Sequence, residues 1–207
     1  MDSHDWDERY RGSDLVWSAT PNVFVEELAG ALAPGEALDV AAGEGRNAVW
    51  LVERGWRVTA ADFSAVAVGR TRDIADRRLG DRADRLRAVV ADATAPAPPA
   101  VAAAGYDLVL FSYLQLPRES WGRALAAGAA AAAPGGAVLV IAHARRNLEE
   151  GTGGPQDPDV LHDPEDVATA AAELPVEVVS AELRRREVEG AERPALDTVV
   201  LLRKRVD

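Results

Sequence analysis

The sequence predicts a single α/β domain, with a doubly wound, seven-stranded, mostly parallel sheet, an antiparallel last strand and helices on both faces. Three observations predict this fold. Short β-branched runs alternate with longer, Ala-rich amphipathic stretches, which is the order of successive βαβ units. Pro and Gly stand together directly before two of the runs, at residues 34–35 and 134–136. The last two runs are joined by a short turn, which indicates an antiparallel hairpin at the end of the chain.

The five runs that we expect to form parallel strands are residues 37–42, 56–61, 86–91, 106–112 and 137–143. The helical patterns between them are residues 46–54, 65–79 and 119–132. Residues 93–105 are rich in Pro and Ala, so we expect a loop there with at most one short helix. The alanines at 124–133 belong to a helix that we expect to pack closely on the sheet, because Ala has the highest helix propensity.

The C-terminal third begins with residues 147–163, which three Gly and two Pro residues interrupt. Long loops inside compact domains are usually functional lids or disordered segments, and we interpret this one as a lid. A helix is expected at residues 164–174. Two strands follow at residues 176–188 and 195–205, and the turn-like residues 189–191 join them into a hairpin.

Composition excludes several classes of function. The 207 residues are 48% hydrophobic and 28% charged, as in globular proteins. They include no Cys, which removes disulfides, thiolate metal sites and cysteine nucleophiles. The three histidines, His4, His143 and His162, are too scattered to indicate a metal site, so we expect none. His162 lies in the Gly- and Pro-rich loop and is expected at the surface.

The net charge indicates which classes of binding partner to expect. With 23 basic and 34 acidic residues the net charge is −11, so we expect neither nucleic acid nor a membrane as partner. The arginines at 184–186 are surrounded by glutamates, which indicates a solvated, ion-paired edge. The sequence contains no apolar run of the roughly 20 residues that span a bilayer, and residues 1–10 lack the apolar centre of a secretory signal. We therefore expect a soluble, cytoplasmic protein, either a monomer or a homodimer.

The sharpest local pattern is residues 38–48, LDVAAGEGRNA, where a strand ends and a helix begins. Gly43, Gly45 and Ala48 satisfy the G-x-G-x-x-G/A pattern of nucleotide-binding turns. Asp62 closes the next strand, where a carboxylate can bind ribose hydroxyls. Taken alone, the pattern is also compatible with a βα turn that binds no ligand.

Two further acids sharpen the prediction. Asp39 lies in the first strand and Asp92 ends the third, so three consecutive strands direct acids toward one crevice. Clustered carboxylates repel one another unless they face donors such as a ribose diol, an amine or a ligand cation. Glu44 and Asp39 crowd the start of the following helix, which disfavours a pyrophosphate there. For Asp92 alone, a solvated loop residue or a helix N-cap remains an alternative.

These residues resemble the first two motifs of class I S-adenosylmethionine-dependent methyltransferases, in which an acid, three residues and Gly-x-Gly precede a second acid that closes strand two. The resemblance covers about residues 38–142, and the terminal hairpin suits that family's reversed last strand. Residues 6–22, WDERYRGSDLVWSATPN, are similar to the N-terminal segment of the thiopurine and tellurite-resistance branch. Asn47 stands in the place of the family's third glycine, as is common in that branch.

The resemblance implies S-adenosylmethionine as the cofactor and assigns residues to its parts. Asp39 and Gly43 would approach the methionine end, and Gly45 would make room for the nucleoside. Asp62 would accept hydrogen bonds from both ribose hydroxyls. The cofactor-binding set is completed by Phe63 beside the adenine, Asp92 and the backbone of Ala93 at its exocyclic amine, and by Ala41, Asn47 and Ser112.

The acceptor is expected at the carboxyl ends of the fourth and fifth predicted strands. Ser112, Tyr113 and Gln115 follow one of them and would lie near the transferring methyl group. His143 ends the other and is a candidate proton acceptor. A core aromatic for Tyr113 and a hydrogen-bonded strand end for His143 remain alternatives. The proposed catalytic pair is therefore His143 and Tyr113, and the proposed substrate contacts are Trp17, Gln115 and Arg145.

We accordingly divide the single domain, residues 1–207, into four parts. They are an N-terminal helical cap segment (1–33), a cofactor-binding core (34–146), the lid-like loop (147–163) and the helix with the C-terminal hairpin (164–207). The predicted reaction is methyl transfer to a small-molecule acceptor by in-line displacement. An NAD(P)-dependent oxidoreductase is the alternative enzyme, which Asp39 and the hairpin disfavour. A non-catalytic S-adenosylmethionine-binding domain also remains open.

Overall fold

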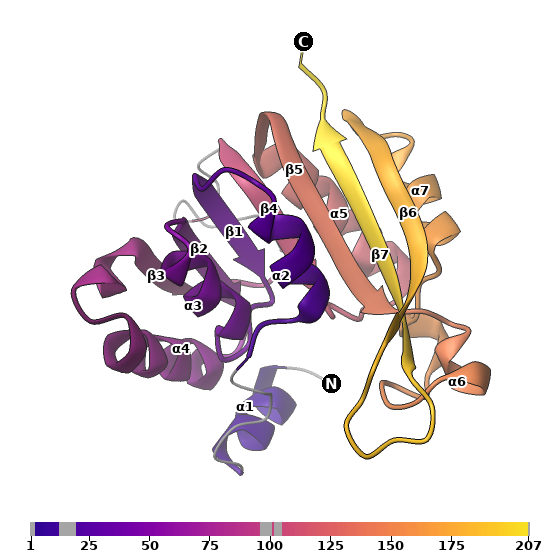
Figure 1. Ribbon diagram of the computed structural model, residues 1–207, viewed down its shortest axis with the longest axis horizontal. Helices are drawn as coiled ribbons and strands as arrows, with labels where there is room; N and C mark the ends of the chain where they lie inside the picture. Colours follow the sequence, from indigo (N-terminus) through magenta and orange to yellow (C-terminus); the bar gives the residue numbers. More distant parts are fainter. Residues whose placement is uncertain (1–2, 13–19, 96–100, 102–104, 207) are drawn as a thin grey trace.

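In the computed structural model, which describes residues 3–12, 20–95, 101 and 105–206, seven strands form one sheet (Figure 1). The strand order is β3-β2-β1-β4-β5-β7-β6. Strand β7 is antiparallel to both its neighbours, whereas β1 to β5 pair in parallel. The predicted doubly wound sheet with a reversed last strand is therefore confirmed. The strands are β1 (Glu36–Val40), β2 (Arg57–Asp62), β3 (Leu86–Val90), β4 (Tyr106–Ser112), β5 (Ala132–His143), β6 (Val176–Arg186) and β7 (Ala195–Lys204).

Helices cover both faces of the sheet and create two hydrophobic cores. On one face the core includes residues of α2 (Val23–Gly30), α3 (Arg46–Glu53) and α4 (Ala65–Leu79). On the other face it includes residues of α5 (Arg118–Ala131) and α7 (Pro164–Ala171), which lie behind the sheet in Figure 1. The shorter helices are α1 (Ser3–Arg11), η1 (Gly80–Arg85), α6 (Asn147–Glu150) and η2 (Pro158–Val160).

Helix α1 packs beside the start of α4, near the carboxyl ends of β1 and β2 (Figure 1). Asp7 of α1 accepts a hydrogen bond from the Ser64 hydroxyl, and a second one from the backbone N–H of Val66 at 3.3 Å. The Ser64 hydroxyl in turn accepts a hydrogen bond from the backbone N–H of Ala67 and caps α4. Asp7 therefore holds the N-terminal helix at the edge of the sheet where the acids were predicted.

The predicted and observed elements agree closely, and two of them, 65–79 and 106–112, agree residue for residue. The largest difference is the start of β5, which lies at Ala132 rather than at residue 137. The Pro134-Gly135-Gly136 sequence does not end the pairing with β4 but shifts its register between Tyr106 and Leu108. A sequence of turn-forming residues can continue a strand when it forms such an irregularity.

Residues 147–163 are more structured than the predicted long loop, because they contain α6 and η2. Asn147 is buried, and its side-chain oxygen accepts a hydrogen bond from the backbone N–H of Leu196 at 2.7 Å. Its side-chain amide donates to the carbonyls of Thr152 and Gly153, at 3.2 and 2.8 Å. The bond from Leu196 ties the segment to the start of β7, and the other two bonds hold the segment's own turn together.

Two surface predictions were wrong. His162 is only 2% exposed, because it packs on Trp121 and its Nε2 lies 3.0 Å from the Leu116 carbonyl oxygen. Arg186 does not belong to a solvated edge, because it points inward and pairs with the buried Asp197. Arg184, on the same strand, does form an ion pair, with Glu27 of α2. In each case the deciding partner lies far away in the sequence.

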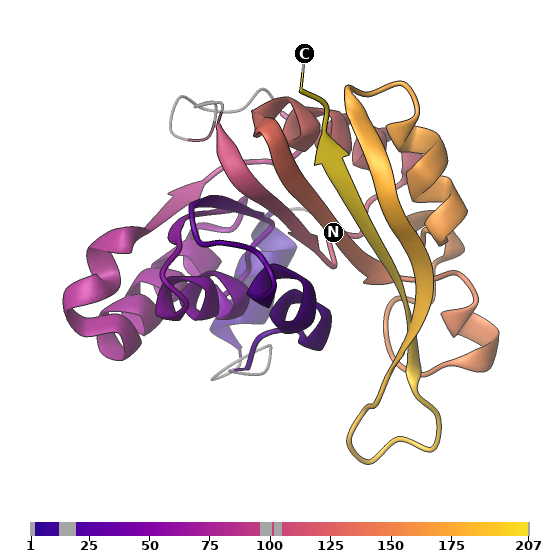
Figure 2. The same ribbon diagram turned by 45° about the horizontal axis from the view of Figure 1, so that its top comes forward.

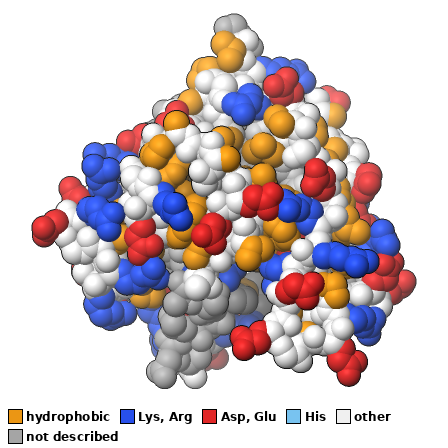
Figure 3. Space-filling view, in the orientation of Figure 1, with side chains coloured by type: hydrophobic (Ala, Val, Ile, Leu, Met, Phe, Trp, Pro, Cys, Tyr) orange, Lys and Arg blue, Asp and Glu red, His pale blue; other side chains and the backbone are white. Residues whose placement is uncertain are grey.

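The hairpin of β6 and β7 extends past the end of β5, so its turn projects from the molecule (Figure 2). On the face that Figure 3 shows, acidic and basic side chains are interspersed. None of the helices in the described part of the chain is long and apolar enough to cross a membrane.

Gly128 tests the predicted close packing of α5 on the sheet. A Cβ at this position would lie 2.5 Å from Cζ of Phe111 in β4, so the Gly128→Ala variant should be destabilised by about 1–3 kcal/mol. Gly122→Ala is the matched control on the same helix, because a Cβ there meets no atom within 4 Å. It should stabilise the helix by about 0.5–1 kcal/mol. Chemical denaturation measures both, and similar shifts in the two variants would contradict the packing.

Candidate functional site

The turn between β1 and α3 has an unusual backbone. Ala41, Gly43 and Gly45 all have positive φ, at 56°, 58° and 78°. Glycine adopts this conformation readily, whereas alanine does so at a cost. At Gly45 a side chain is also excluded by packing, because a Cβ would lie 2.6 Å from Cγ2 of Thr71 in α4. Packing against Thr71 thus explains why residue 45 is a glycine. Its predicted contact with a nucleoside stays a prediction.

Asp62 binds this turn to the end of β2. Its carboxylate accepts hydrogen bonds from the backbone N–H groups of Gly43, at 2.8 Å, and Ser64, at 2.9 Å. Burial raises the pKa of Asp62, and the hydrogen bonds from Ser64 and Gly43 act in the opposite direction. A carboxylate has about four lone-pair positions. The backbone N–H of Phe63 also lowers its pKa as a hydrogen-bond donor. Some acceptor capacity is left, and the predicted ribose contact of Asp62 stays a prediction.

Asp39 is 1% exposed, and neither of its oxygens has a hydrogen-bond partner among the described residues. Burial raises the pKa of Asp39 to about 7; the charge of Arg46 acts against this shift, and Asp62 adds to it. A buried carboxylate without a well-formed hydrogen bond is costly even when a positive charge lies nearby. A ligand with a positive charge or several N–H donors would remove that cost.

Arg46 is a site residue that the sequence analysis missed. It begins α3, is half-buried and interacts electrostatically with Asp39 on one side and with Tyr113, Arg186 and Asp197 on the other. Burial lowers the pKa of its guanidinium. Its position directly after the Gly-x-Gly pattern was the signal that could have identified it.

Glu44 does not act as predicted. It is 3% exposed and pairs with Arg70 of α4 at 2.7 Å. Because this ion pair compensates its charge, the acidic character of the turn comes from Asp39 more than from Glu44.

The end of β3 is more open. Asp92 is exposed, and one of its oxygens accepts hydrogen bonds from the backbone N–H and the hydroxyl of Thr94, both at 2.8 Å. This is the turn-residue role that was the alternative for Asp92. Phe63 and Ala93 are each partly buried nearby in sequence. The predicted adenine contacts of all three residues stay predictions.

Unpartnered polar groups also follow β4, which is the neighbour of β1 in the sheet. Ser112 Oγ and Gln115 Nε2 are buried without a hydrogen-bond partner among the described residues. Folded proteins satisfy nearly all buried polar atoms. The buried side-chain atoms that lack a hydrogen-bond partner in the described chain belong to Asp39, Ser112 and Gln115, and to the closely spaced pair His143 and Asp197. The unmet hydrogen bonds are thus concentrated at the adjacent ends of β1 and β4.

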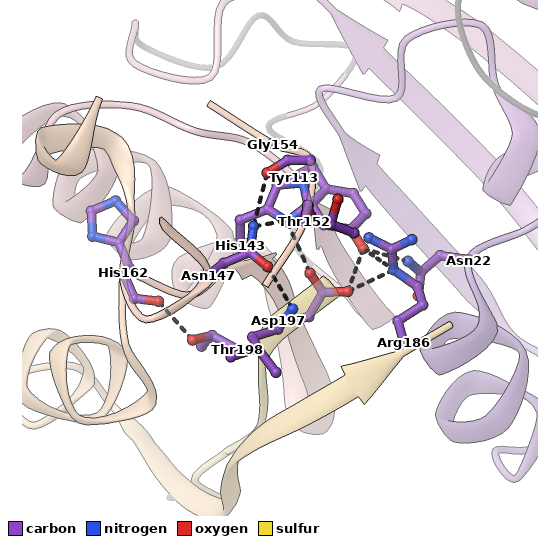
Figure 4. A network of polar contacts seen from close by, with 12 residues as sticks. Asn22, Tyr113, His143, Asn147, Thr152, Gly154, His162, Arg186, Asp197 and Thr198 are labelled. Atoms are coloured by element: carbon purple, nitrogen blue, oxygen red, sulfur yellow. Dashed lines mark hydrogen bonds and ion pairs between the residues drawn. The ribbon is translucent and has the colours of Figure 1, made fainter. Parts of the chain in front are cut away.

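Asp197 organises a separate polar network beyond β4 (Figure 4). It is fully buried on β7, and its Oδ1 lies 3.0 Å from Nδ1 of His143. Its Oδ2 accepts hydrogen bonds from Arg186 Nε at 2.7 Å and the Tyr113 hydroxyl at 2.8 Å. Burial raises the pKa of Asp197, but the hydrogen bonds and charges of His143 and Arg186 outweigh it and keep the pKa below its usual range.

Tyr113 has φ 61° and its hydroxyl also accepts a hydrogen bond from Asn22 Nδ2 at 3.0 Å. Burial and the neighbouring Asp197 raise the pKa of Tyr113 well above its usual value, so it remains a neutral phenol. This favours a positioning role over proton abstraction. Asn22 is in turn held by Asn47, whose Oδ1 accepts its backbone N–H at 3.0 Å. Asn47 therefore supports the N-terminal segment, and its cofactor contact stays a prediction.

Of the remaining predicted substrate residues, Arg145 lies apart from this network. Arg145 pairs with Asp163 and Asp166 and lines a cavity of about 350 Å³ beside the starts of α5 and α7. Its substrate contact stays a prediction. Trp17 lies outside the described residues. Within the described chain no group of three or more His, Cys, Asp or Glu residues is placed to hold a metal ion.

Residues 37–136, just under half of the chain, match the family model described as Methyltransferase domain. The chain is also similar to a protein solved in work on the conversion of a disulfide bond into a thioacetal group during echinomycin biosynthesis. That pair has 22% identity and a TM-score of 0.74, and the alignment covers 98% of this chain and 91% of the other. None of the curated protein sequences compared with this chain matches it.

Two further solved structures are similar. One is the 1,6-didemethyltoxoflavin-N1-methyltransferase of Burkholderia thailandensis, solved with 1,6-didemethyltoxoflavin and S-adenosylhomocysteine (20% identity, TM-score 0.68, covering 99% of this chain and 87% of that one). The other is an S-adenosylmethionine-dependent methyltransferase of Methanosarcina mazei (14% identity, TM-score 0.68, covering 87% and 98%). With the matched domain, these likenesses support the predicted enzyme class and fold. Residues 37–136 therefore match a methyltransferase domain, and the solved structures confirm its fold.

Asp39 should make the free protein less stable as pH rises. The folded state keeps the Asp39 proton up to about pH 7, whereas the unfolded chain loses it near the usual pKa of 3.8. The free energy of unfolding should therefore fall between these values, by about 2–4 kcal/mol. Denaturation of Asp39→Asn at pH 5 and 8 should show a smaller fall, with the part due to Asp62 retained. The exposed Asp107→Asn variant, at the opposite end of β4, is the control and should behave like the wild type. An equal fall in all three proteins would contradict the assignment.

Proposed function

We propose that this protein is an S-adenosylmethionine-dependent methyltransferase. Its small-molecule acceptor would bind at the carboxyl ends of β4 and β5, next to the cofactor at the ends of β1 and β2. The concentration of unpartnered buried polar atoms at the ends of β1 and β4 is the observation that carries this proposal. A ligand that both fills this edge and supplies donors and acceptors would satisfy them.

The residues present fit the cofactor. S-adenosylmethionine, when bound, supplies an electrophilic methyl group on a sulfonium sulfur. Asp39 would receive the positively charged methionine end, and Asp62 has acceptor capacity for the ribose diol. The left-handed turn at Ala41, Gly43 and Gly45 carries no bulky side chain and so allows a close approach of its backbone.

The residues on the acceptor side would mainly position the acceptor for the transfer. In-line methyl transfer needs little covalent help, and orientation alone can contribute about 7–11 kcal/mol. Tyr113 and Gln115 would orient the acceptor, and His143 would take its proton. His143 is mostly buried but not sealed, since its side chain is 13% exposed.

The likeness to the thiopurine and tellurite-resistance branch is part of this proposal for the N-terminal segment and the cofactor turn, and it assigns no acceptor. It is supported by the similarity of residues 6–22 and by Asn47 in place of the third glycine. The bond from Asn22 to Asn47 ties the described end of that segment to the cofactor turn, as a cap over the site would require. Residues 13–19 of the segment, with Trp17, lie outside the described residues.

Ligand-induced stabilisation tests the proposal first. S-adenosylhomocysteine at 100 times its Kd should add about 2.7 kcal/mol to the free energy of unfolding, whereas NAD should add none. Stabilisation by NAD would favour the oxidoreductase alternative. A panel of small hydroxyl, amine and thiol compounds, assayed with S-adenosylmethionine, then separates an active enzyme from a non-catalytic binding domain.

Asp62→Ala should weaken S-adenosylhomocysteine binding by about 10- to 100-fold, since hydrogen bonds to a charged group contribute about 1.5–3 kcal/mol. The same change releases the Gly43 backbone N–H and so loosens the turn. Calorimetry measures the affinity, with Asp107→Ala as the control at the opposite edge of the sheet. Unchanged affinity in Asp62→Ala would rule out the ribose role.

Residues 147–163 should exchange amide hydrogens more slowly when S-adenosylhomocysteine and an acceptor are both bound, as expected of a lid. Gly154 supports this expectation, because a Cβ there would lie 2.7 Å from the His143 ring, so the segment already lies beside the acceptor side. Hydrogen exchange measured by mass spectrometry tests the expectation. Equal rates with and without ligands would indicate a fixed structural segment.

A further inference from the structure

Asp197 is a buried acid that the proposed function does not yet explain. It lies on β7 directly opposite His143 of β5 in the antiparallel register, which brings the two side chains together. It is 0% exposed, and both of its oxygens face polar partners. A carboxylate that is fully buried beside a guanidinium, a phenol and an imidazole is a fixed feature of the fold rather than a solvated charge.

The hydrogen-bond partners of Asp197 indicate which ring nitrogen of His143 carries a proton. Arg186 Nε can only donate, and the Tyr113 hydroxyl donates to Oδ2 while it accepts from Asn22. Oδ2 is therefore occupied by two donors. Oδ1, which is likewise an acceptor, lies 3.0 Å from His143 Nδ1, in a contact that is not aligned as a hydrogen bond. Two bare lone pairs at this distance would repel each other, which favours the hydrogen on Nδ1. In the neutral ring the free lone pair then resides on Nε2.

The surroundings of the ring leave Nε2 usable. No hydrogen bond of Nε2 is found within the described part of the chain, and the Tyr113 ring packs beside the imidazole with centroids 4.7 Å apart. Gly154 lies next to Nε2, and a Cβ at this position would come within 3.0 Å of it. A glycine here keeps this edge of the ring free of a side chain. The charged and titratable groups that surround His143 among the described residues are Asp197 from β7, Tyr113 from β4 and Arg186 from β6. Arg46 from α3 interacts electrostatically with these three groups.

We propose that Asp197 positions His143 in its Nδ1–H tautomer, with Arg186 and Tyr113 holding the carboxylate, so that Nε2 takes the proton of the methyl acceptor. This inference rests on the proposed function. In the step, the O–H or N–H bond of the acceptor breaks and an Nε2–H bond forms. The electron pair left on the acceptor is the pair that attacks the methyl carbon, and Asp197 stabilises the resulting imidazolium.

The pair also indicates the class of acceptor. A hydroxyl or amine nucleophile carries a proton that must leave during methylation, and a built proton acceptor serves that chemistry. An anionic thiolate needs no such group. We therefore infer that the acceptor is a hydroxyl or amine compound.

The tautomer can be measured without any acceptor. Protonated and bare ring nitrogens differ widely in 15N chemical shift, and the chain contains only three histidines. In protein labelled with 15N-histidine at about pH 8, His143→Gln assigns the signal of this ring, and His162 serves as an internal control. We expect the Nδ1–H form for His143. An Nε2–H form in the wild type would overturn the inference, whatever the protein methylates.

Asp197→Asn provides the sharper variant. Two donors face the Oδ2 position, so the amide oxygen must lie there, and the amide NH2 must face His143 Nδ1. Nδ1 would then have to accept a hydrogen bond, which forces the ring into the Nε2–H form. We expect the 15N spectrum to show this switch in Asp197→Asn and to show no change in the control, Asp107→Asn. An unchanged tautomer in folded Asp197→Asn would overturn the inference.

Turnover measurements then distinguish a positioning role of Asp197 from a purely structural one. With a hydroxyl or amine acceptor from the panel, Asp197→Asn and His143→Gln should each lower the single-turnover rate by about 10²–10⁴-fold. The affinity for S-adenosylhomocysteine should change less than about twofold, and the double variant should be little slower than either single one. A full rate in Asp197→Asn, or activity confined to thiols, would overturn the inference. Absence of methyl transfer to any acceptor by the wild type, despite the expected tautomer, would refute the proposed function instead.

Discussion

The parallel pairing of β1 with β2 and β4 is the constraint on which the site depends. Because parallel strands end at the same edge of a sheet, this pairing places Asp39, Asp62 and Ser112 at one edge from positions far apart in the sequence. The reversed strand adds a second contribution. An antiparallel strand begins where its neighbours end, so the start of β7 places Asp197 beside His143 at that same edge.

The two halves of this edge differ in how their polar groups are satisfied. At the ends of β1 and β4, buried polar atoms lack partners within the described chain, and the pKa of Asp39 is raised to about 7 as a result of burial. Around Asp197, by contrast, Arg186, Tyr113 and Asn22 are joined by hydrogen bonds, and the His143 ring lies in close contact with the carboxylate. The first half is therefore incomplete without a ligand, whereas the second is organised before any ligand arrives.

The N-terminal residues join these two halves. Asn22 donates through its backbone to Asn47 at the cofactor turn and through its side chain to Tyr113 in the Asp197 network. Asp7 of α1 caps the start of α4 near Asp62. Displacement of Asn22 would thus disturb both the cofactor turn and the Asp197 network.

The sequence alone was sufficient to predict the sheet, its reversed strand and the acidic edge, because these features depend on patterns of neighbouring residues. β-Branched runs mark strands, glycines mark the turn, and Asp39 and Asp62 lie at fixed distances from them. The same local logic placed α4 and β4 at their observed bounds.

Only the tertiary structure decided which charges are paired. Glu44 is compensated by Arg70, Arg186 points inward to Asp197, and His162 is buried on Trp121. None of these partners is close enough in sequence to form a recognisable pattern. The pairing of His143 with Asp197, 54 positions later, follows from the register of β5 and β7. Register is set by packing across the whole sheet, so the proton-transfer side of the site could not be read from the sequence.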